Sequence, residues 1–514
     1  MKVAHLALAV VPAAALTLSE VQQQIAGFAT TVQKSPETSP TLGCRIACQF
    51  LQTALPEALF LPNSTVYEQT ELSYWSQQQS KVRPACRLLP ATSSDVSLAL
   101  LVSRATQCPF AVKSGGHSPA QGSSNVQGGV TIDFARMKDI QISADKTEVA
   151  IEPGNVWYDV YTHLLPHNIT VIGGRVSPIG TSGLTLGGGI SFFSNQHGWA
   201  CDNVNAYEVV MADGTLRTVT AKQYPDLYWA LRGGGNNFGI VTRLHLAAYP
   251  QGDLWAGSRF YPLTDENTKA HTEALAHFTE RSTEDPKAQV IQAYVYAQVY
   301  NMYVLASDLQ YSVPQPFPAI LSNFTAIQGA FTDTLRITDL PSLTLEFNEN
   351  QPNGLRQAWH ATMVEIDAEL LQELVAIWKA GVEDVKNLKG SLPTLAMQPL
   401  SLDVLRLMGK NGGNALGLAG GKKPLLLVSL LFTWADEADD ELVYHTANTL
   451  FDRVVEAAKA KGRYNKYIYL NYGGQDQKVL QSYGDDNYAR LKAISHKYDP
   501  QQVFQKLQPG GFKL

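Results

Sequence analysis

The sequence predicts an α+β fold with more than one lobe, and three observations lead to this expectation. Residues 85–250 consist of short β-forming runs separated by glycine turns. Beyond Pro250 glycine becomes scarce, and longer strands and amphipathic helices follow. The chain of 514 residues is also longer than one ordinary hydrophobic core supports. We therefore expect two lobes that differ in their secondary structure.

The first eighteen residues are typical of a signal peptide. Lys2 precedes a short apolar stretch, Ala4–Leu18, which contains the small residues Ala13–Ala15. This stretch is too short to span a bilayer comfortably. The alternative is a hydrophobic first helix of the fold. Three N-glycosylation triplets, at Asn63, Asn168 and Asn323, also favour export, so we expect a secreted or secretory-pathway protein with no membrane partner.

Four of the five cysteines lie before residue 110: Cys44, Cys48, Cys86 and Cys108. In an exported protein they predict two disulfides, for which three pairings are possible. Cys44 and Cys48 lie four residues apart on a predicted helix, where a mutual bond would be strained. We expect each to bond to Cys86 or Cys108, with free buried thiols as the alternative. Cys201 is expected to be a buried thiol.

Short strands and two helices are predicted in the glycine-rich part of the chain. The strands are expected at 109–112, 130–133, 149–152, 207–211 and 240–244, and the helices near 94–105 and 156–165.

Longer elements are predicted after residue 250. We expect an alternating strand at 292–304, an apolar strand at 425–432, helices at 364–378 and 436–459, a strand and turn at 467–474, and a helix near 488–496. Tyr294, Tyr296, Tyr300 and Tyr303 could face a pocket from the first of these strands, or could pack on helices instead.

Charge and metal-ligand spacing exclude two classes of function. The net charge of −6 is mild, and no Lys/Arg cluster could follow a run of phosphates, so nucleic acid is not expected as a partner. No CxxC pair or Cys/His spacing predicts a metal site.

Two glycine-rich loops indicate a binding site for a phosphate-containing ligand. One is Lys113–Ser118, and the other runs from Gly173 to Gly189. Loops without side chains let backbone N–H groups approach a pyrophosphate closely. Neither loop is a G-x-G-x-x-G or a G-x-x-x-x-G-K-[ST] fingerprint, which argues against a Rossmann domain and a nucleotide triphosphatase.

Further motifs follow these loops in a fixed order: Asp202-Asn203-Val204, the run Arg232–Thr242, the stretch Tyr469–Tyr472 and the ending Tyr498–Phe504. With these motifs the chain resembles the berberine-bridge-enzyme-like branch of the vanillyl-alcohol-oxidase, or PCMH-type, flavoproteins, and most of all its secreted fungal oxidases. The resemblance spans residues 40 to 514.

This resemblance implies a two-part PCMH-type FAD-binding domain, a substrate domain with an antiparallel sheet covered by helices, and a C-terminal segment that returns to the FAD domain. The expected division is a signal peptide (1–18), an N-terminal segment packing on the FAD domain (19–82), the FAD-binding domain (83–251), the substrate domain (252–462) and the berberine-like segment (463–514). We expect a monomer.

The family binds its flavin to the histidine of a G-G-H motif, which here is His117. Some relatives add a cysteine link at the position of Val176, and a valine cannot form that bond. The resemblance therefore implies FAD attached through His117 alone. Gly174 falls where the family controls oxygen access, and a residue without a side chain there favours an oxidase.

The resemblance also assigns the remaining cofactor contacts and the catalytic pair. Asn471 is expected at the flavin and Tyr472 as the base, in preference to Tyr469. Besides His117, Gly174 and Asn471, the implied cofactor-binding residues are Ser114, Gly115, Gly116, Ser118, Ser177, Gly180, Thr181, Ser182, Gly183, Asp202, Val204, Gly239 and Val241.

The implied activity is an FAD-dependent oxidase that passes a substrate hydride to flavin N5 and the electrons to molecular oxygen, giving hydrogen peroxide. Its small-molecule substrate is expected to be a secondary metabolite, an alcohol or a carbohydrate. Two alternatives remain. One is an oxidative or redox-neutral flavin-dependent cyclase, and the other is a flavin-binding protein without turnover.

Overall fold

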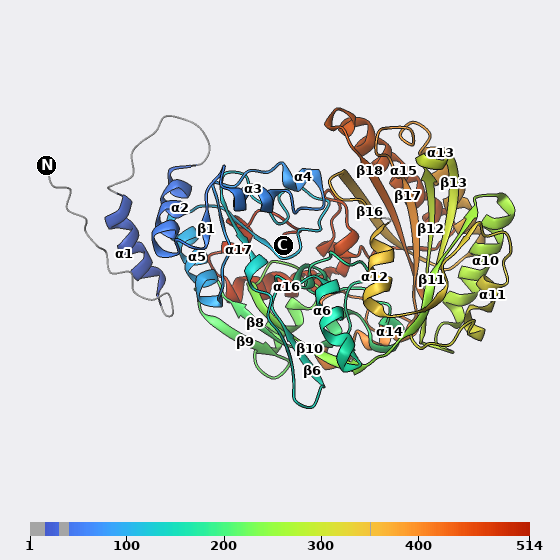
Figure 1. Cartoon of the computed structure of the whole chain (residues 1–514), viewed down its shortest axis with the longest axis horizontal. Coiled ribbons are helices and arrows are strands. Elements are labelled where there is room, and N and C mark those ends of the chain that lie inside the picture. Colours follow the sequence, from blue (N-terminus) through green and yellow to red (C-terminus); the bar gives the residue numbers. More distant parts are fainter. Residues whose placement is uncertain (1–15, 30–40, 350) are drawn as a thin grey trace.

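The computed structural model describes residues 16–29, 41–349 and 351–514. The predicted signal peptide lies almost wholly outside these residues and stays a prediction. Within the described part of the chain, no helix is long and apolar enough to cross a membrane. Its strands form three sheets, of four, six and nine strands, and Figure 1 shows the largest of them at one end of the molecule.

The first sheet has the order β1–β2–β4–β3, and β2, β4 and β3 are parallel. Helix α5 (Ser93–Thr106) connects β2 to β3, as a parallel arrangement requires. This helix begins with a capping box formed by Thr92 and Asp95 and buries its apolar residues in the same core as the strands. The strands are β1 (Leu59–Phe60), β2 (Cys86–Leu88), β3 (Phe110–Lys113) and β4 (Val130–Asp133).

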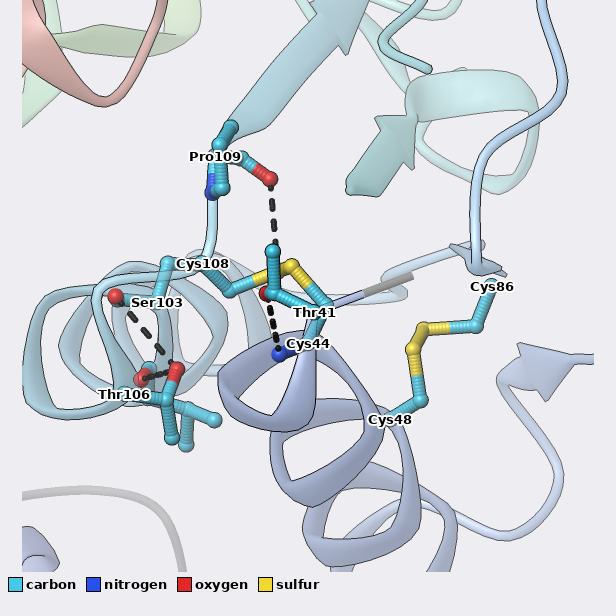
Figure 2. Close-up of a disulfide and its surroundings, with 9 residues drawn as sticks. Thr41, Cys44, Cys48, Cys86, Ser103, Thr106, Cys108 and Pro109 are labelled. Atoms are coloured by element: carbon cyan, nitrogen blue, oxygen red, sulfur yellow. Dashed lines mark hydrogen bonds between the residues drawn. A yellow bond between two sulfur atoms is a disulfide. The ribbon is translucent and has the colours of Figure 1, made fainter. Parts of the chain in front are cut away.

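Two disulfides attach helix α2 (Leu42–Ala54) to this sheet (Figure 2). Cys44 bonds to Cys108, at the start of β3, and Cys48 bonds to Cys86 in β2. The predicted helix and the predicted crossing are confirmed, and the structure selects one of the two crossed pairings. Cys201 is free and buried, as expected.

The second sheet is antiparallel and is organised around its longest strand, β10. This strand pairs with β6, β7 and β8. Helices α6 (Trp157–Leu164) and α9 (Pro225–Leu231) share its core. The strands are β5 (Ile140–Ile142), β6 (Glu148–Ile151), β7 (Ile169–Val171), β8 (Val204–Val210), β9 (Leu216–Thr220) and β10 (Ile240–Pro250).

The third sheet is antiparallel and has the order β14–β11–β13–β12–β17–β18–β16–β19, with β15 paired to β11. Helices α10 (Asp265–Arg281), α13 (Ala368–Gly381) and α15 (Asp440–Ala460) bury their apolar faces against it. In Figure 1 α10 and α13 lie on its outer side. The strands are β11 (Leu254–Pro262), β12 (Ala288–Ala297), β13 (Met302–Tyr311), β14 (Thr332–Asp333), β15 (Arg336–Thr338), β16 (Arg356–Glu365), β17 (Thr394–Leu400), β18 (Leu425–Trp434) and β19 (Tyr464–Asn465).

The remaining α-helices of the described residues connect or cover these sheets. They are α1 (Leu18–Ala29), α3 (Thr65–Glu71), α4 (Gln77–Ser80), α7 (Thr181–Leu186), α8 (Ser194–His197), α11 (Ser322–Thr325), α12 (Leu340–Glu349), α14 (Leu402–Leu407), α16 (Asp485–Tyr498) and α17 (Val503–Lys506).

Several predicted elements have the wrong extent. The strand expected at 240–244 continues to Pro250 in β10, and the strand expected at 207–211 begins at Val204 in β8. The strand expected at 292–304 is a hairpin of β12 and β13, and Asn301 turns the chain in the left-handed region with φ of 49°. The helix expected from Val364 begins only at Ala368, because Asp367 caps it and Val364 belongs to β16. The strand expected at 467–474 is a 3₁₀ turn, Leu470–Tyr472.

The four tyrosines of the hairpin divide between the two predicted environments. Tyr294 is buried in the core between sheet and helices, and the ring of Tyr303 packs edge-on against Trp378 of α13. Tyr296 contacts Tyr303 on the same side, whereas Tyr300 lines the cavity described below. Tyr294 and Tyr296 are two residues apart on β12 and Tyr303 pairs with Tyr296, so these three share one face of the sheet, whereas Tyr300 lies in the 3₁₀ turn between the strands.

The C-terminal segment returns to the first two sheets, as expected. The side chain of Asn237 donates to the carbonyl of Phe512, and that of Asn236 donates to the carbonyl of Gly510. The backbone N–H of Phe110 in β3 donates to the carbonyl of Leu507. Residues more than 250 positions apart in the sequence therefore lie next to one another in the folded chain.

Loss of the Cys44–Cys108 bond should destabilise the protein. The bond spans 64 residues, and closing a loop of that length removes enough unfolded-state entropy to contribute about 4 kcal/mol. We expect the Cys44→Ala/Cys108→Ala double variant to lose about this amount in urea unfolding. Cys201→Ala removes a thiol without opening a loop and serves as the control. A double variant no less stable than the control would contradict the prediction.

Candidate functional site

A cavity of about 770 Å³ lies where the three sheets meet, and its size is typical of a small-molecule site. Its lining comes from the loop after β3, the glycine-rich loop around α7, the start of β10, the inner face of the third sheet and the C-terminal segment. The predicted site residues that line it are Ser114, Gly115, Gly116, His117, Ser118, Gly180, Ser182, Gly183, Gly239, Val241, Asn471 and Tyr472.

The two glycine-rich loops touch each other through their backbones. A Cβ atom built on Gly115 would fall on the backbone of Gly180, and one built on Gly180 would fall on Gly115. Only residues without side chains allow this approach. The contact joins the first sheet to the loop that precedes α7.

His117 is enclosed at the cavity wall. Burial lowers the pKa of its imidazole to about 4, so the ring is neutral at physiological pH. Its Nε2 atom is buried and has no hydrogen-bond partner among the described residues. Trp75 stacks on the ring with centroids 4.3 Å apart and planes within 10°. A neutral, oriented imidazole with a free nitrogen is suited to hold a bound group.

Aromatic rings continue from Trp75 across the cavity wall. Trp359 meets Trp75 edge-on at 5.7 Å and meets Tyr472 at 4.8 Å. These contacts connect the segment before α4, strand β16 and the 3₁₀ turn of the C-terminal segment, so Tyr472 is held on the wall that also carries His117.

Tyr472 is hydrogen-bonded to a cation. The guanidinium of Arg175 donates to its hydroxyl oxygen at 3.1 Å and to Oε1 of Gln398 at 2.6 Å. Arg175 is itself buried. A buried cationic donor stabilises negative charge on the oxygen to which it donates.

Tyr469 has a different environment. Its hydroxyl oxygen accepts from the backbone N–H groups of Gly189 and Ile190 and from the side chain of Asn471. Burial raises the pKa of this phenol. Asn471 also donates to the carbonyl of Leu184 in α7. Tyr469 and Asn471 thus attach the C-terminal turn to the glycine-rich loop.

The structure does not bring five of the predicted residues to the cavity lining: Gly174, Ser177, Thr181, Asp202 and Val204. A Cβ atom on Gly174 would meet the indole of Trp157, which gives this glycine a packing role. Val176, in contrast, does line the cavity.

Asp202 is engaged in a buried ion pair. Its carboxylate is 3.1 Å from the guanidinium of Arg232 and accepts from Asn414 at 2.7 Å. Burial raises the pKa of Asp202, and Arg232 and Asn414 act in the opposite direction. Through Arg232 and Asn414, the carboxylate of Asp202 connects the second sheet to the loop before β18.

Several polar and aromatic lining residues were not assigned to the site from the sequence, among them Trp75, Arg175, Asp308 and Gln398. Nothing in the sequence marks Trp75. Arg175 directly follows Gly173-Gly174, and a cation in a glycine-rich loop of the phosphate-binding type indicates a residue that faces a ligand. Asp308 follows the apolar cavity-facing residues Val304 and Ala306 on β13, and Gln398 follows Ala396 on β17, which is the pattern of a polar group facing a ligand.

The cavity fits an FAD. Glycine backbones from both loops line it, and the buried hydroxyl of Ser182 has no partner among the described residues, as expected where a ligand completes the hydrogen bonds. The unpartnered Nε2 of His117 has the same character. Fold and cavity together define a flavoprotein of the oxidoreductase class.

Comparison with known proteins agrees with this class. A family described as "FAD binding domain" matches residues 84–220, and one described as "Berberine and berberine like" matches residues 468–509. The "FAD-dependent monooxygenase tpcD" of Cochliobolus heterostrophus is 38% identical over 450 residues, 86% of this chain and 87% of that protein. The "Bifunctional solanapyrone synthase" of Alternaria solani is 34% identical, covering 93% and 91%. The chain belongs to the berberine-like family of FAD-dependent oxidoreductases.

Solved structures share the fold at low sequence identity. The xylooligosaccharide oxidase of Myceliophthora thermophila C1 superposes with a TM-score of 0.72 at 19% identity, covering 89% of this chain and 98% of that one. The 6-hydroxy-D-nicotine oxidase of Arthrobacter nicotinovorans has a TM-score of 0.72 at 18% identity, covering 87% and 96%.

Two glycine variants should separate loop packing from ligand binding. Gly180→Ala places a Cβ on the Gly115 backbone, so we expect a loss of about 1–3 kcal/mol in stability together with loss of FAD. Gly183→Ala, within α7, meets no protein atom within 4 Å and should keep its stability. Because Gly183 lines the cavity, this variant should still bind less FAD. Urea unfolding and the FAD absorbance per chain measure both effects, and full FAD content in Gly183→Ala would contradict the prediction.

Proposed function

We propose that this protein is an oxidase that holds FAD covalently through His117 alone, oxidises a small-molecule substrate and reduces molecular oxygen to hydrogen peroxide. One arrangement carries the proposal: the unpartnered Nε2 of His117 and the Arg175-bound hydroxyl of Tyr472 lie on one glycine-lined cavity. When bound, the flavin would accept a hydride from the substrate and return the electrons to oxygen.

The protein's own residues divide the remaining work. Tyr472 would act as its phenolate, which takes the substrate proton and becomes the phenol, and the guanidinium of Arg175 stabilises the negative charge on the phenolate oxygen before the transfer. Asn471, fixed by Leu184 and Tyr469, positions the turn that carries Tyr472. Gly183, which has no protein atom near its Cβ position, offers room for the pyrophosphate, and Gly115, Gly180, Gly239 and Val241 line the same cavity. Val176 provides no thiol for a second link.

Oxygen as the electron acceptor is supported by the structural neighbours named as oxidases. Gly174 adds no support, because it packs on Trp157 and does not line the cavity.

Oxygen insertion is the second candidate function, because tpcD and other relatives are named FAD-dependent monooxygenases. The two activities differ in products. An oxidase releases one hydrogen peroxide per substrate and leaves ¹⁸O₂ out of the product, whereas a monooxygenase incorporates one ¹⁸O atom. Turnover without air and without peroxide would instead indicate a cyclase, an activity compatible with the likeness to a bifunctional synthase.

We also propose that the protein is secreted as a monomer. Two disulfides are typical of an oxidising compartment, and Asn63, Asn168 and Asn323 are all exposed, as glycosylation requires.

The tether is tested by mass spectrometry of the denatured protein. The wild-type chain should be heavier by one FAD and yellow after denaturation, whereas His117→Ala should have the mass of the chain alone. His163→Ala, an exposed histidine on α6, should keep the adduct. An unmodified wild-type mass would overturn the covalent attachment. FAD binding without a covalent bond would still be measured by the visible absorbance of the native protein.

The base is tested by separating flavin reduction from flavin reoxidation in stopped-flow experiments. Tyr472→Phe should slow reduction by about 10²–10⁴-fold, as expected for loss of a general base, with the first substrate that reduces the wild-type flavin. Reoxidation of the dithionite-reduced variant by air should keep the wild-type rate.

Tyr469→Phe is the contrasting variant. It leaves two backbone N–H groups without their acceptor, so its main effect should be lower stability. Unchanged reduction in Tyr472→Phe would exclude Tyr472 as the base, and reoxidation taking minutes in the wild type would exclude an oxidase and favour a flavin-binding protein without turnover.

A further inference from the structure

The wall of the cavity formed by the third sheet is flat and apolar. Ala306 of β13, Ala293 of β12 and Ala396 of β17 lie side by side in register on three neighbouring strands, and all three line the cavity. Val304 and Val295 form the adjacent row, which Thr394 of β17 continues, and Phe260 of β11 stands beside Ala306 at the edge of the alanine row. The small residues in register produce a level strip, because no long side chain rises from these positions.

Such a surface is unsuited to a carbohydrate. A sugar ring carries a hydroxyl group on most of its carbons, and each hydroxyl that loses water without gaining a partner costs free energy. The alanines and valines offer no side-chain donors or acceptors, and the hydroxyl of Thr394 in the valine row already donates to the carbonyl of Leu392. A flat apolar molecule loses nothing by lying on this surface and gains by burying its area.

Polar groups gather on the other side of the alanine row. Asp308 lies opposite Ile291 in the next row of the sheet, and Gln398 follows Ala396 on the same face of β17. Ser258 donates to Oδ1 of Asp308 at 2.6 Å, and no other hydrogen bond to this carboxylate is formed by the described residues. The second oxygen, Oδ2, is therefore available to a ligand.

Two charged groups act on Asp308 from the elements packed around it. Burial raises the pKa of its carboxyl to about 6; the hydrogen bond from Ser258 lowers it, Glu346 of α12 raises it, and Arg175 lowers it. Asp308 is therefore mostly ionised at pH 7 and accepts a hydrogen bond from a ligand hydroxyl. Arg175 acts on Asp308 and also donates to the hydroxyl of Tyr472. Asp308 therefore lies in the same part of the cavity as the proposed base.

Resting on the proposed function, we infer that the substrate is a flat, largely apolar hydroxylated ring compound, not a sugar, and that Asp308 accepts the hydrogen bond of its hydroxyl group while the alanine row supports its ring.

The test is equilibrium binding to the FAD-loaded enzyme by isothermal titration calorimetry at pH 7.5. The probes are 2-naphthol, its methyl ether 2-methoxynaphthalene, and cellobiose. We expect 2-naphthol to bind, the methyl ether to bind about tenfold more weakly because it cannot donate, and cellobiose to show no binding at the same concentration. Cellobiose binding as tightly as 2-naphthol, or equal binding of naphthol and ether, would overturn the inference.

Asp308→Asn tests the carboxylate. This variant should bind 2-naphthol about tenfold more weakly and bind the methyl ether unchanged. Asp253→Asn, the same substitution at an exposed position before β11, is the matched control and should bind like the wild type. Ala293→Phe, which raises a ring from the alanine row, should weaken both aromatic probes. Unchanged 2-naphthol binding in Asp308→Asn would remove Asp308 from the site.

The pH dependence gives a readout that a structural role would not produce. The ionised carboxylate is present above its pKa of about 6 and is lost as the pH falls through that value, so binding of 2-naphthol to the wild type should weaken below pH 6. Asp308→Asn should show no such change. Identical pH profiles would contradict the inference, and none of these measurements depends on flavin reoxidation, which tests the oxidase separately.

Discussion

The site depends on the contact between the backbones of Gly115 and Gly180. Gly115 follows β3, one of the parallel strands of the first sheet, and Gly180 precedes helix α7, which packs with the antiparallel second sheet. Because neither carries a side chain, the two loops meet at van der Waals distance and place His117 and Arg175 on one cavity. A methyl group on either residue would separate the sheets that the cavity joins.

Nε2 of His117 and the hydroxyl of Ser182 are buried at the cavity and have no partner within the described residues. Each costs folding free energy unless a ligand or water supplies a hydrogen bond. Extensive apolar cores and two disulfides in the N-terminal part stabilise the chain around them. A folded chain with such groups is stabilised further when its cofactor binds.

The third sheet forms the helix-covered core with one face and lines the cavity with the other, because successive side chains of a strand point to opposite faces. In β12, Tyr294 packs towards the helices while Ala293 and Val295 face the cavity. In β13, Leu305 and Leu309 are in the helix-covered core while Ala306 and Asp308 face inward. The large residues therefore stabilise the lobe, and the small ones leave space for a substrate.

Local patterns were enough to predict many elements. Strand β4 was predicted at its observed position, and α5 and β18 were predicted to within two residues at each end, because alternation, glycine punctuation and helical periodicity act within a short stretch of chain. The hairpin at Asn301 was missed because the alternation of β12 continues into β13, and only pairing between the strands shows that the chain has turned. The start of helix α13 was predicted too early for a related reason. Val364 suits a helix or a strand equally well, and its pairing with Leu426 of β18 places it in strand β16.

The sequence by itself determined the class of the protein, because its motifs and glycine loops are read along the chain. It determined the residues available to hold a flavin, and it excluded a second link at Val176. Only the tertiary structure decided which of these residues share a cavity, since Trp75, Arg175, Asp308 and Tyr472 come from segments up to 397 positions apart and meet through packing alone. It also assigned Gly174 and Asp202 to packing and ion pairing, because the neighbours Trp157 and Arg232 that engage them are contacts in space that no local pattern encodes.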